Sequence, residues 1–382
     1  MNSPRDYVVV GGGLAGGLLT LAIRHLQARA TVTLVERAEC VAGNHTWAFH
    51  AADVPSAADP FVRPLVAAAW PGYRVNFPGY ARRVDSPYAA VTSDRMAAAL
   101  AGCGANVLTG AEATEVAAGH VTLVGGETLR GRCVIDARGT APGGALAACG
   151  FQKFVGLEVE TERHWPDDVP TVMDAAVPQD DGFRFVYALP FGPRRVLVED
   201  TAFSNRPGLD RAGMRDRVAQ AIDAQGVGAW RVVREESGVL PMPWAAGQVD
   251  VRPTGPLVAG YRGGWFHPAT GYSFPAAVRL ALAVASVPPE GASAAAAALA
   301  RRLASRQRVA RFLNRLLFTA VVPAERWRVF RRLYRSLPDP LMARFYALEF
   351  GALDAARVFA GWPPPLSLFR RPEVRPCPAP TH

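Results

Sequence analysis

The N-terminal segment carries the pattern that most constrains the fold of this chain. An apolar run leads into three spaced glycines, and a second apolar run ends in an acid about 20 residues later. Gly11 permits a tight turn, Gly13 lets the backbone approach a pyrophosphate, and Gly16 lets a helix pack close to the strand. Glu36 is placed to accept a hydrogen bond from a ribose hydroxyl. The pattern predicts a dinucleotide-binding strand–turn–helix–strand unit, and it fits FAD and NAD equally.

Length and composition limit the class of protein. With 382 residues, 50% of them hydrophobic, the chain is long enough for a globular protein of two or three domains. The N-terminus lacks signal-peptide features, and no run approaches the ~18 unbroken apolar residues of a membrane-spanning helix. The five cysteines are odd in number and unpaired in spacing, which argues against a disulfide framework or a zinc site. We expect a cytoplasmic protein with reduced thiols and no bound metal, either soluble or peripheral to a membrane.

A buried strand is predicted over residues 132–135. It runs directly into Asp136, Arg138 and Gly139. At the carboxyl end of a parallel strand, an acid and a glycine would face a cofactor bound by the N-terminal glycines. An ordinary exit from a strand into a loop is the alternative explanation of the same residues.

The pattern changes in the middle of the chain. Short alternating strands predominate over residues 151–243, apart from a helix predicted over 211–225, which favours an inserted antiparallel sheet. After it, a strand over 256–260 leads through a glycine-rich loop to a helix over 275–285, another site for an anion or a ring edge. The expected division is a discontinuous dinucleotide-binding domain (1–150 and 244–290), a substrate domain (151–243) and a C-terminal helical, arginine-rich region (291–382).

The C-terminal region concentrates positive charge. The net charge of the chain is +9, and twelve arginines lie between Arg301 and Phe350 against three acids. Apolar and aromatic side chains alternate with these arginines at helical spacing. Such a basic amphipathic face can bind anionic lipid headgroups, and the alternative is a solvated face on an ordinary helical cap. No nucleic-acid recognition motif supports a nucleic-acid partner.

Together with the N-terminal pattern, five short segments resemble the bacterial lycopene β-cyclases. They are residues 44–50, 173–175, 182–187, 199–201 and 266–273, and the similarity extends from Asp6 to about residue 364. The resemblance implies a Rossmann-type FAD-binding domain with an inserted antiparallel-sheet domain, similar to the p-hydroxybenzoate hydroxylase and geranylgeranyl reductase flavoproteins, plus the C-terminal helices. It implies cyclisation of lycopene to β-carotene through γ-carotene with reduced FAD and no net redox change. NAD(P)H as the ultimate reductant, acyclic carotenoids and a membrane surface are the expected partners.

The resemblance also assigns roles to residues. The acidic catalytic position of the family falls on Glu199, and Asp200 beside it is the second catalytic candidate. The predicted substrate-binding residues are Phe183, Phe185 and Tyr187. The predicted cofactor-binding residues are Gly11, Gly13, Leu14, Ala15, Gly16, Glu36, His45, Trp47, Asp136, Arg138, Gly139, His267, Thr270, Gly271 and Tyr272. For both histidines, a hydrogen-bonded structural role is the alternative.

The two acids are predicted to lie on opposite sides of a hairpin with a five-residue loop over 190–194. In the favoured register Phe185 lies opposite Glu199, and Arg184 lies opposite Asp200 on the other side. A slip of one residue would set Glu199 opposite either Arg184 or Val186, and the first of these is also a charge pair, so charge matching leaves the register open. Alternation places Glu199 on one side with Phe183, Phe185, Tyr187, Leu197 and Thr201.

Protonation of an alkene requires an acid that keeps its proton near neutral pH. A glutamate in water has a pKa of about 4.3, and raising it by about 3 units requires roughly 4 kcal/mol, which burial in an apolar pocket supplies. We therefore expect Glu199, or a water that it holds, to protonate the terminal double bond, while Asp200 stays charged beside Arg184. Anionic reduced flavin and aromatic faces would stabilise the resulting cation. A solvent-facing strand acid is the alternative for Glu199.

Two rival functions stay open on the sequence. A flavin-dependent polyprenyl reductase or hydroxylase would have a similar fold, but it would oxidise NAD(P)H in proportion to its product. A noncatalytic carotenoid carrier at the membrane surface would bind the polyene without converting it.

Overall fold

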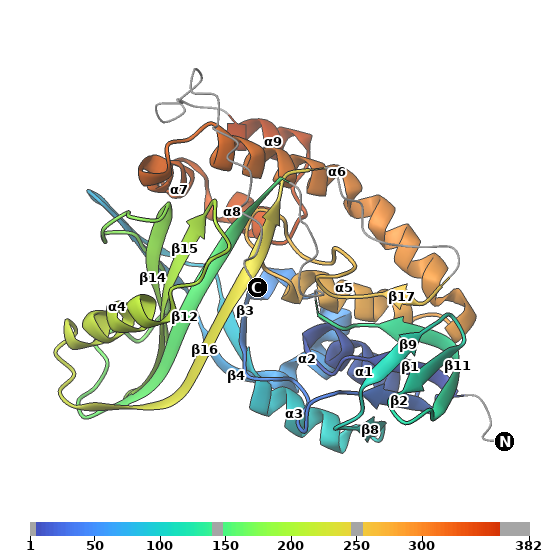
Figure 1. The fold of residues 1–382 in the computed structure, drawn as a ribbon. Coiled ribbons are helices and arrows are strands. Elements are labelled where there is room, and N and C mark those ends of the chain that lie inside the picture. The colour runs from blue at the N-terminus through green and yellow to red at the C-terminus, as the bar shows by residue number, and fades with distance from the viewer. Residues whose placement is uncertain (1–4, 140–147, 246–254, 360–382) are drawn as a thin grey trace, which may run out of the picture.

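The computed structural model describes residues 5–139, 148–245 and 255–359 of the chain. The end of the predicted C-terminal region, residues 360–382, lies outside the described residues. Two large sheets stand side by side, and helices from the C-terminal region run across one end of the molecule from one sheet to the other (Figure 1). This arrangement confirms the predicted α/β class with a second, largely antiparallel sheet and C-terminal helices.

The first sheet forms around the N-terminal glycine pattern. Its parallel strands lie in the order β8 (Asn106–Leu108), β2 (Val32–Val35), β1 (Arg5–Val10), β11 (Thr128–Asp136) and β17 (Leu257–Val258), and the antiparallel β10 (His120–Leu123) and β9 (Ala113–Val116) extend it. Parallel strands are covered on both faces, which explains the unbroken apolar run of β1. Helix α1 (Leu14–Leu26) packs against α5 (Phe274–Ala285). The carboxyl ends of β1, β2, β11 and β17 meet at one edge, where this class of sheet binds ligands.

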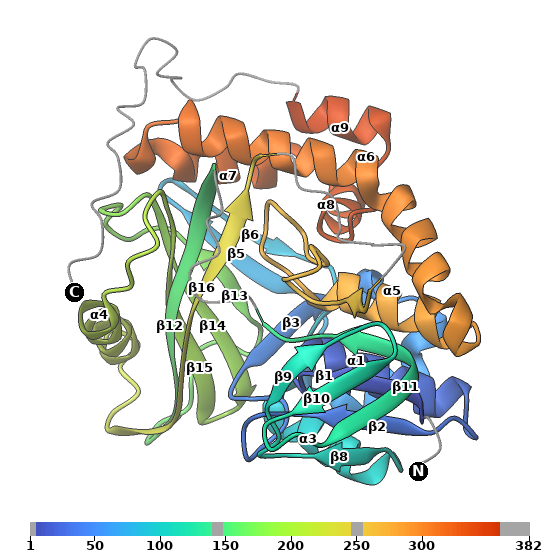
Figure 2. The same ribbon diagram turned by 45° about the vertical axis from the view of Figure 1, so that its right-hand side comes forward.

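The second sheet has one covered face and one face turned toward the first sheet (Figure 2). Its strands lie in the order β16 (Trp230–Pro243), β12 (Cys149–Thr161), β15 (Arg195–Ser204), β14 (Phe183–Gly192), β13 (Thr171–Asp174), β5 (Tyr73–Phe77) and β6 (Tyr80–Val84). Helix α4 (Arg211–Asp223) covers the outer face through a small core that includes Leu157, Val196 and Ile222. Alternation along the strands therefore sends every second side chain toward the first sheet.

Two strands of the second sheet come from outside the segment predicted to form it. Strands β5 and β6 lie within residues 73–84, and β5 pairs in parallel with β13, so that Asp174 lies opposite Asn76. The predicted substrate domain covers residues 151–243 alone, whereas the observed sheet contains strands from residues 73–84 as well as from 149–243. Local patterns do not encode a pairing between strands so far apart in the chain. The division of the whole chain into three parts stays a prediction.

The hairpin that carries Glu199 differs from the predicted register. The predicted pairing of Phe185 with Glu199 is wrong, because Tyr187 lies opposite Glu199, and Arg184 does not lie opposite Asp200. The strands β14 and β15 continue to within two residues of each other instead of leaving the predicted five-residue loop. Side-chain direction repeats every second residue, so this slip of two residues keeps each side chain on its predicted face.

A small sheet and short helices join the two large sheets. Strands β3 (Thr46–His50), β7 (Tyr88–Thr92) and β4 (Val66–Trp70) form an antiparallel three-stranded sheet. Helix α3 (Ser93–Gly102) begins after Thr92, whose hydroxyl accepts a hydrogen bond from the Arg95 backbone N–H and caps the helix. The remaining short helical segments are α2 (Asp59–Val62) and 3₁₀ turns over Ala51–Asp53, Ser56–Ala58, Arg63–Leu65, Pro289–Gly291 and Pro323–Glu325.

The C-terminal helices are α6 (Ala292–Thr319), α7 (Arg326–Ser336), α8 (Asp339–Tyr346) and α9 (Ala352–Phe359). Not all of their arginines are solvated. Arg326 is fully buried and donates hydrogen bonds to the backbone carbonyls of Phe203 and Leu317, which ties α7 to the end of β15. Among the helices in the described part of the chain, none combines the length and the apolar character required to cross a membrane.

Candidate functional site

A cavity of about 1060 Å³ lies between the two large sheets. One end is lined by the glycine turn after β1 and by the ends of β2 and β11. The cavity continues along the inner face of β12, β14, β15 and β16 and reaches helices α6 to α9. Its wall contains most of the predicted site residues: Gly11, Gly13, Leu14, Ala15, Glu36, His45, Trp47, Arg138, Gly139, Phe185, Tyr187, Glu199, Thr270, Gly271 and Tyr272.

The three glycines of the N-terminal pattern, at positions 11, 13 and 16, are each needed for a different structural reason. Gly11 has a φ of +102°, and a Cβ there would lie 2.7 Å from the Ala137 carbonyl oxygen. A Cβ on Gly16 would lie 1.9 Å from the Gly11 carbonyl oxygen, so that glycine permits α1 to pack against the turn. A Cβ on Gly13 would meet no described atom within 4 Å. Gly13 therefore keeps open a space that belongs to the cavity rather than to the packed protein.

Glu36 holds the glycine turn and the end of β2 together. Its Oε2 accepts a hydrogen bond from the Gly12 backbone N–H at 2.7 Å, and its Oε1 accepts one from the Ala38 backbone N–H at 2.9 Å. Each carboxylate oxygen retains a further lone pair, because a carboxylate offers about four acceptor positions. A contact between Glu36 and a ribose hydroxyl stays a prediction that this geometry permits.

Asp136 lies behind the wall of the cavity. Its carboxylate accepts hydrogen bonds from Arg138 at 2.8 and 2.9 Å and from Arg262 at 3.2 Å. Burial acts to raise the pKa of Asp136, but these two arginines outweigh it and hold the pKa below its ordinary value. Asp136 thereby fixes Arg138, which does line the cavity together with Gly139.

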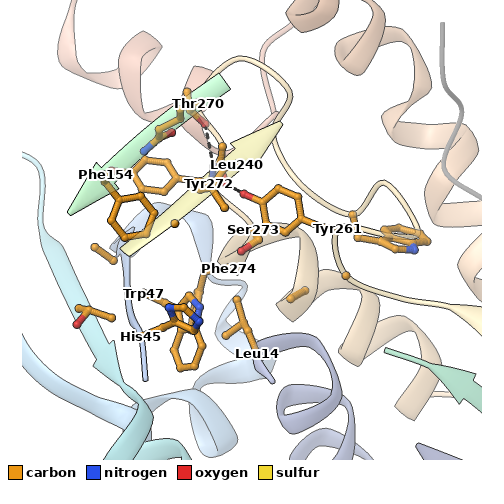
Figure 3. A pocket seen from close by; sticks show the side chains of 18 of the residues that line it. Leu14, His45, Trp47, Phe154, Leu240, Tyr261, Thr270, Tyr272, Ser273 and Phe274 are labelled. Atoms are coloured by element: carbon orange, nitrogen blue, oxygen red, sulfur yellow. Dashed lines mark hydrogen bonds between the residues drawn. The ribbon is translucent and has the colours of Figure 1, made fainter. Parts of the chain in front are cut away.

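The loop before α5 supplies another part of the wall. Figure 3 shows Leu14, His45 and Trp47 around one end of this part of the cavity and Thr270 and Tyr272 around the other. The rings of His45 and Trp47 are 6.1 Å apart. Burial lowers the pKa of His45, so the imidazole is neutral at neutral pH.

His267 does not line the cavity. Its Nε2 lies 3.0 Å from the Phe345 carbonyl oxygen, and its Nδ1 accepts a hydrogen bond from the Ala269 backbone N–H. Burial lowers the pKa of His267 to about 4, so the ring is neutral. His267 connects the loop to α8, and its position supports the structural alternative rather than a direct contact with a cofactor.

Glu199 projects from β15 into the cavity among aromatic side chains. Tyr187 is its cross-strand partner on β14, and Phe185 lies on the same face. Burial and the neighbouring Glu236 carboxylate hold the pKa of Glu199 well above its ordinary value, against an opposing effect of Arg234. Glu199 is only partly enclosed by protein, because it opens onto the cavity itself. This environment favours the protonated form of the Glu199 carboxyl group over the ionised form.

Asp200 lies on the opposite face of the same strand. It is 1% exposed and accepts hydrogen bonds from Arg184 at 2.6 Å and from Arg217 of α4 at 2.8 Å. The predicted contact between Arg184 and Asp200 therefore exists, although the two residues are diagonal rather than opposite. Two arginines surround this carboxylate on the α4 side of the sheet, so the structure gives it a role in joining α4 to the sheet.

Phe183 is also withdrawn from the cavity. Its ring stacks on Phe330 of α7 at 4.1 Å and is fully buried. It supports the wall formed by Phe185 and Phe330 rather than forming that wall itself. Gly16, Asp136, Phe183, Asp200 and His267 are thus the predicted site residues that do not line the cavity.

Two features at or beside the cavity were not predicted. Glu236 of β16 is 5% exposed and lies beside Glu199. The hydroxyl of Tyr88 on β7 lies 3.0 Å from that of Tyr187 and 2.6 Å from that of Tyr272. These contacts join segments that are far apart in the chain, so no local sequence pattern predicts them. Glu236 and Gly238 are two residues apart on β16 and therefore face the same side of the sheet. This spacing was the available sequence signal that Glu236 faces inward.

The chain matches known proteins over nearly its full length. The model of the lycopene cyclase protein family matches residues 6–371. The chain belongs to the lycopene cyclase family. Curated lycopene β-cyclases of Pseudescherichia vulneris and Pantoea ananas are 40% and 37% identical to it, each over 94% of this chain and over 94% and 95% of their own lengths. The predicted family is confirmed.

Solved structures place this lycopene cyclase family member in the flavoprotein fold. A geranylgeranyl bacteriochlorophyll reductase-like protein from Thermoplasma acidophilum aligns with a TM-score of 0.64 at 14% identity, covering 94% of this chain and 96% of its own. A mutant of halogenase PltM in complex with FAD aligns with a TM-score of 0.59 at 12% identity, covering 90% and 82%. At these identities the likeness concerns the fold. Within the described residues, no group of three or more His, Cys, Asp or Glu side chains is arranged to hold a metal ion.

Proposed function

We propose that this protein is a lycopene β-cyclase that converts the linear ends of lycopene to β-rings, giving β-carotene through γ-carotene. One observation carries the proposal: Glu199, with its raised pKa, faces a largely apolar cavity that also contains the dinucleotide-type glycine turn. The relatives that share this chain over nearly its full length are named lycopene β-cyclases. Asp200, on the other face of the sheet, is left out of the catalytic step.

FAD is the cofactor that we propose for the end of the cavity near the glycine turn. The open space at Gly13 fits a pyrophosphate, the N-terminus of α1 favours its charge, and Glu36 offers an acceptor to the ribose. When bound in its reduced form, the flavin supplies an electron-rich ring that stabilises positive charge without a net transfer of electrons. We propose NAD(P)H as the ultimate source of those electrons.

The residues of the chain account for the proton chemistry. Glu199 donates its proton to the terminal double bond, the resulting tertiary cation is attacked by the next double bond, and loss of a proton from the new ring completes an isomerisation. The faces of Phe185 and Tyr187 line the path and stabilise the cation. The apolar wall excludes water, which would otherwise capture the cation as an alcohol.

An anaerobic assay tests the function directly. Purified protein with FAD reduced by dithionite is incubated with lycopene in the absence of NAD(P)H, and the pigments are separated by chromatography. We expect γ-carotene followed by β-carotene, with the flavin still reduced at the end, because the reaction is redox-neutral. A product with added hydrogen and a matching loss of reduced flavin would instead indicate a reductase. Bound lycopene that stays unconverted would indicate a carrier.

We also propose that the protein docks on anionic membrane surfaces through α6 and α9. Phe312 is 49% exposed and Leu353 is 81% exposed, and Phe312 lies 5.7 Å from the ring of Phe359, which lines the cavity. Arg308 and Arg315 lie three or four residues from Phe312 along α6 and flank it on the same face. Lycopene is expected to reside in lipid, so this end of the cavity suits its entry.

Charge reversal at this face is expected to weaken membrane binding. In liposome sedimentation, Arg308→Glu combined with Arg315→Glu should reduce binding to anionic vesicles by a factor of at least about 30, since the loss of each arginine near the surface alone removes about 1 kcal/mol and the new glutamates add repulsion. Arg301→Glu with Arg302→Glu, at exposed positions nearer the start of α6, is the matched control. Equal binding of the wild-type protein to neutral and anionic vesicles would contradict the docking face.

A further inference from the structure

Two carboxyl groups meet above one glycine in the second sheet. Gly156 of β12 lies opposite Glu199 of β15 on one side and opposite Glu236 of β16 on the other. Directly opposite residues in antiparallel strands point to the same face, so both glutamates rise on the cavity side. Strands flanking a central strand are about 10 Å apart, a gap that two glutamate side chains leaning toward each other can span.

Gly156 makes this approach possible. A Cβ at this position would lie 2.7 Å from Cγ of Glu199, so any other residue would push the side chain of Glu199 away. With glycine there, the side chains of Glu199 and Glu236 can lean toward each other, and their carboxyl groups can share a hydrogen bond. An ionised carboxylate only accepts hydrogen bonds, so a bond between two carboxyl groups requires one proton. The pair thus carries one proton and one negative charge.

The neighbouring charges decide which carboxyl group keeps the proton. Arg234 donates hydrogen bonds to Glu236 and to Glu158 of β12, and these carboxylates are 5% and 3% exposed. An arginine contact favours the ionised form, so Glu236 carries the charge. No cation among the described residues makes a hydrogen bond or an ion pair of this kind with Glu199.

The other titratable groups that face the pair do not change this result. His45, from the loop before β3, lies near Glu236 and is neutral, because burial lowers its pKa. Tyr187 of β14 lies opposite Glu199, and its pKa is well above the ordinary value, first because of burial and then because of its neighbours. The proton therefore rests on Glu199, which faces the cavity between an ionised carboxylate and a neutral phenol.

We propose that Glu236 is a positioning residue that holds the acidic proton on Glu199, and that Gly156 provides the space in which the two carboxyl groups share it. The inference rests on the proposed function, because it assigns the state of the acid that starts cyclisation. Glu236 acts through Glu199 and not on the substrate. Ionised Glu236 also makes a second negative charge at Glu199 costly, which favours rapid reprotonation after each transfer.

The pH–rate profile of Glu236→Gln tests this role in the flavin-loaded protein. Activity needs protonated Glu199, so the rate falls as the pH rises through the pKa of Glu199. Removal of the negative charge at Glu236 lowers that pKa, and the alkaline limb should move down by about one pH unit or more. The rate on that limb then falls about tenfold, while the rate at lower pH stays near that of the wild type. Glu235→Gln is the control, because Glu235 is exposed, on the other face of β16, and pairs with Arg215.

Gly156→Ala provides a second variant that retains both carboxyl groups. Its Cβ displaces Glu199 from Glu236, so its alkaline limb should move in the same direction as that of Glu236→Gln. If Glu236→Gln does not fold, the pH–rate profile of Gly156→Ala tests the proposal instead. An alkaline limb that stays in place in both variants, or a rate that falls equally at every pH, would overturn the proposal.

An infrared titration separates this inference from the proposed function. The C=O band of a buried protonated carboxyl group should be present in the wild-type protein without substrate, disappear in Glu199→Gln, and titrate at lower pH in Glu236→Gln. If lycopene is not converted by the wild type but the band behaves in this way, the proposed function fails and the carboxyl pair stands. A band that titrates at the same pH with and without Glu236 would refute the pair itself.

Discussion

Replacement of Glu199 by glutamine is expected to abolish cyclisation while lycopene and flavin stay bound. Glutamine has the same shape but has no acidic proton to give to an alkene, and a positioned general acid typically contributes 10²–10⁴-fold to the rate. We expect a loss of about 10³-fold or more, measured as β-ring products by pigment chromatography. Flavin absorbance and co-purified pigment report whether the cavity stays intact.

The control for this change is Glu160→Gln on β12, which removes an exposed ion pair with Arg231. Exposed pairs contribute about 0–1 kcal/mol, so this variant should match the wild type in stability and in rate. Cyclisation by Glu199→Gln at a rate near that of the wild type would show that another group supplies the proton. Loss of flavin or pigment together with activity would indicate damage to the cavity instead.

Replacement of Gly13 by valine is expected to prevent flavin binding without unfolding the protein. A Cβ at position 13 would meet no described atom within 4 Å, so we expect the packed chain to accommodate valine, whose side chain would fill the space proposed for the pyrophosphate. We expect the affinity for FAD to fall at least about 100-fold, equivalent to about 2.7 kcal/mol. Fluorescence titration with FAD measures the affinity, and thermal unfolding without FAD should give an unchanged midpoint.

Gly119→Val is the matched control, because Gly119 is equally free of neighbours but lies away from the cavity. It should bind FAD as the wild type does. Unchanged flavin affinity in Gly13→Val would remove the glycine turn from the cofactor site. A lowered unfolding midpoint in the absence of flavin would show that valine disturbs the fold itself.

The parts of the fold that follow from local patterns were predictable. The glycine pattern and the apolar run of β1 both reflect contacts within one strand–turn–helix unit. Alternation placed Glu199 and Tyr187 on one face and Asp200 on the other, and the structure retains those faces. A slip of two residues leaves each side chain on its predicted face of the sheet but changes the residue that lies opposite it. The predicted register was therefore wrong, while the environment of Glu199 was close to the expected one.

The parts that depend on distant segments were not predictable from one sequence. Glu236 meets Glu199 only because β12 lies between β15 and β16, and nothing near residue 236 indicates that order. The hydroxyl contacts of Tyr88 join the small sheet to the second sheet and to the loop before α5 in the same way. His267 was assigned to the cofactor site because of its neighbours in the sequence. Its contact with the Phe345 carbonyl oxygen of α8 could not be predicted, because α8 lies far along the chain.

The origin of β5 and β6 has a practical consequence for protein engineering. Residues 73–84 complete the edge of the second sheet, although they are synthesised well before the strands that they join. A chimera that exchanges the second sheet between two members of the family by swapping residues 149–243 alone would combine a foreign β13 with a native β5. Both segments must therefore be exchanged together if such hybrids are to fold and their product specificities are to be compared.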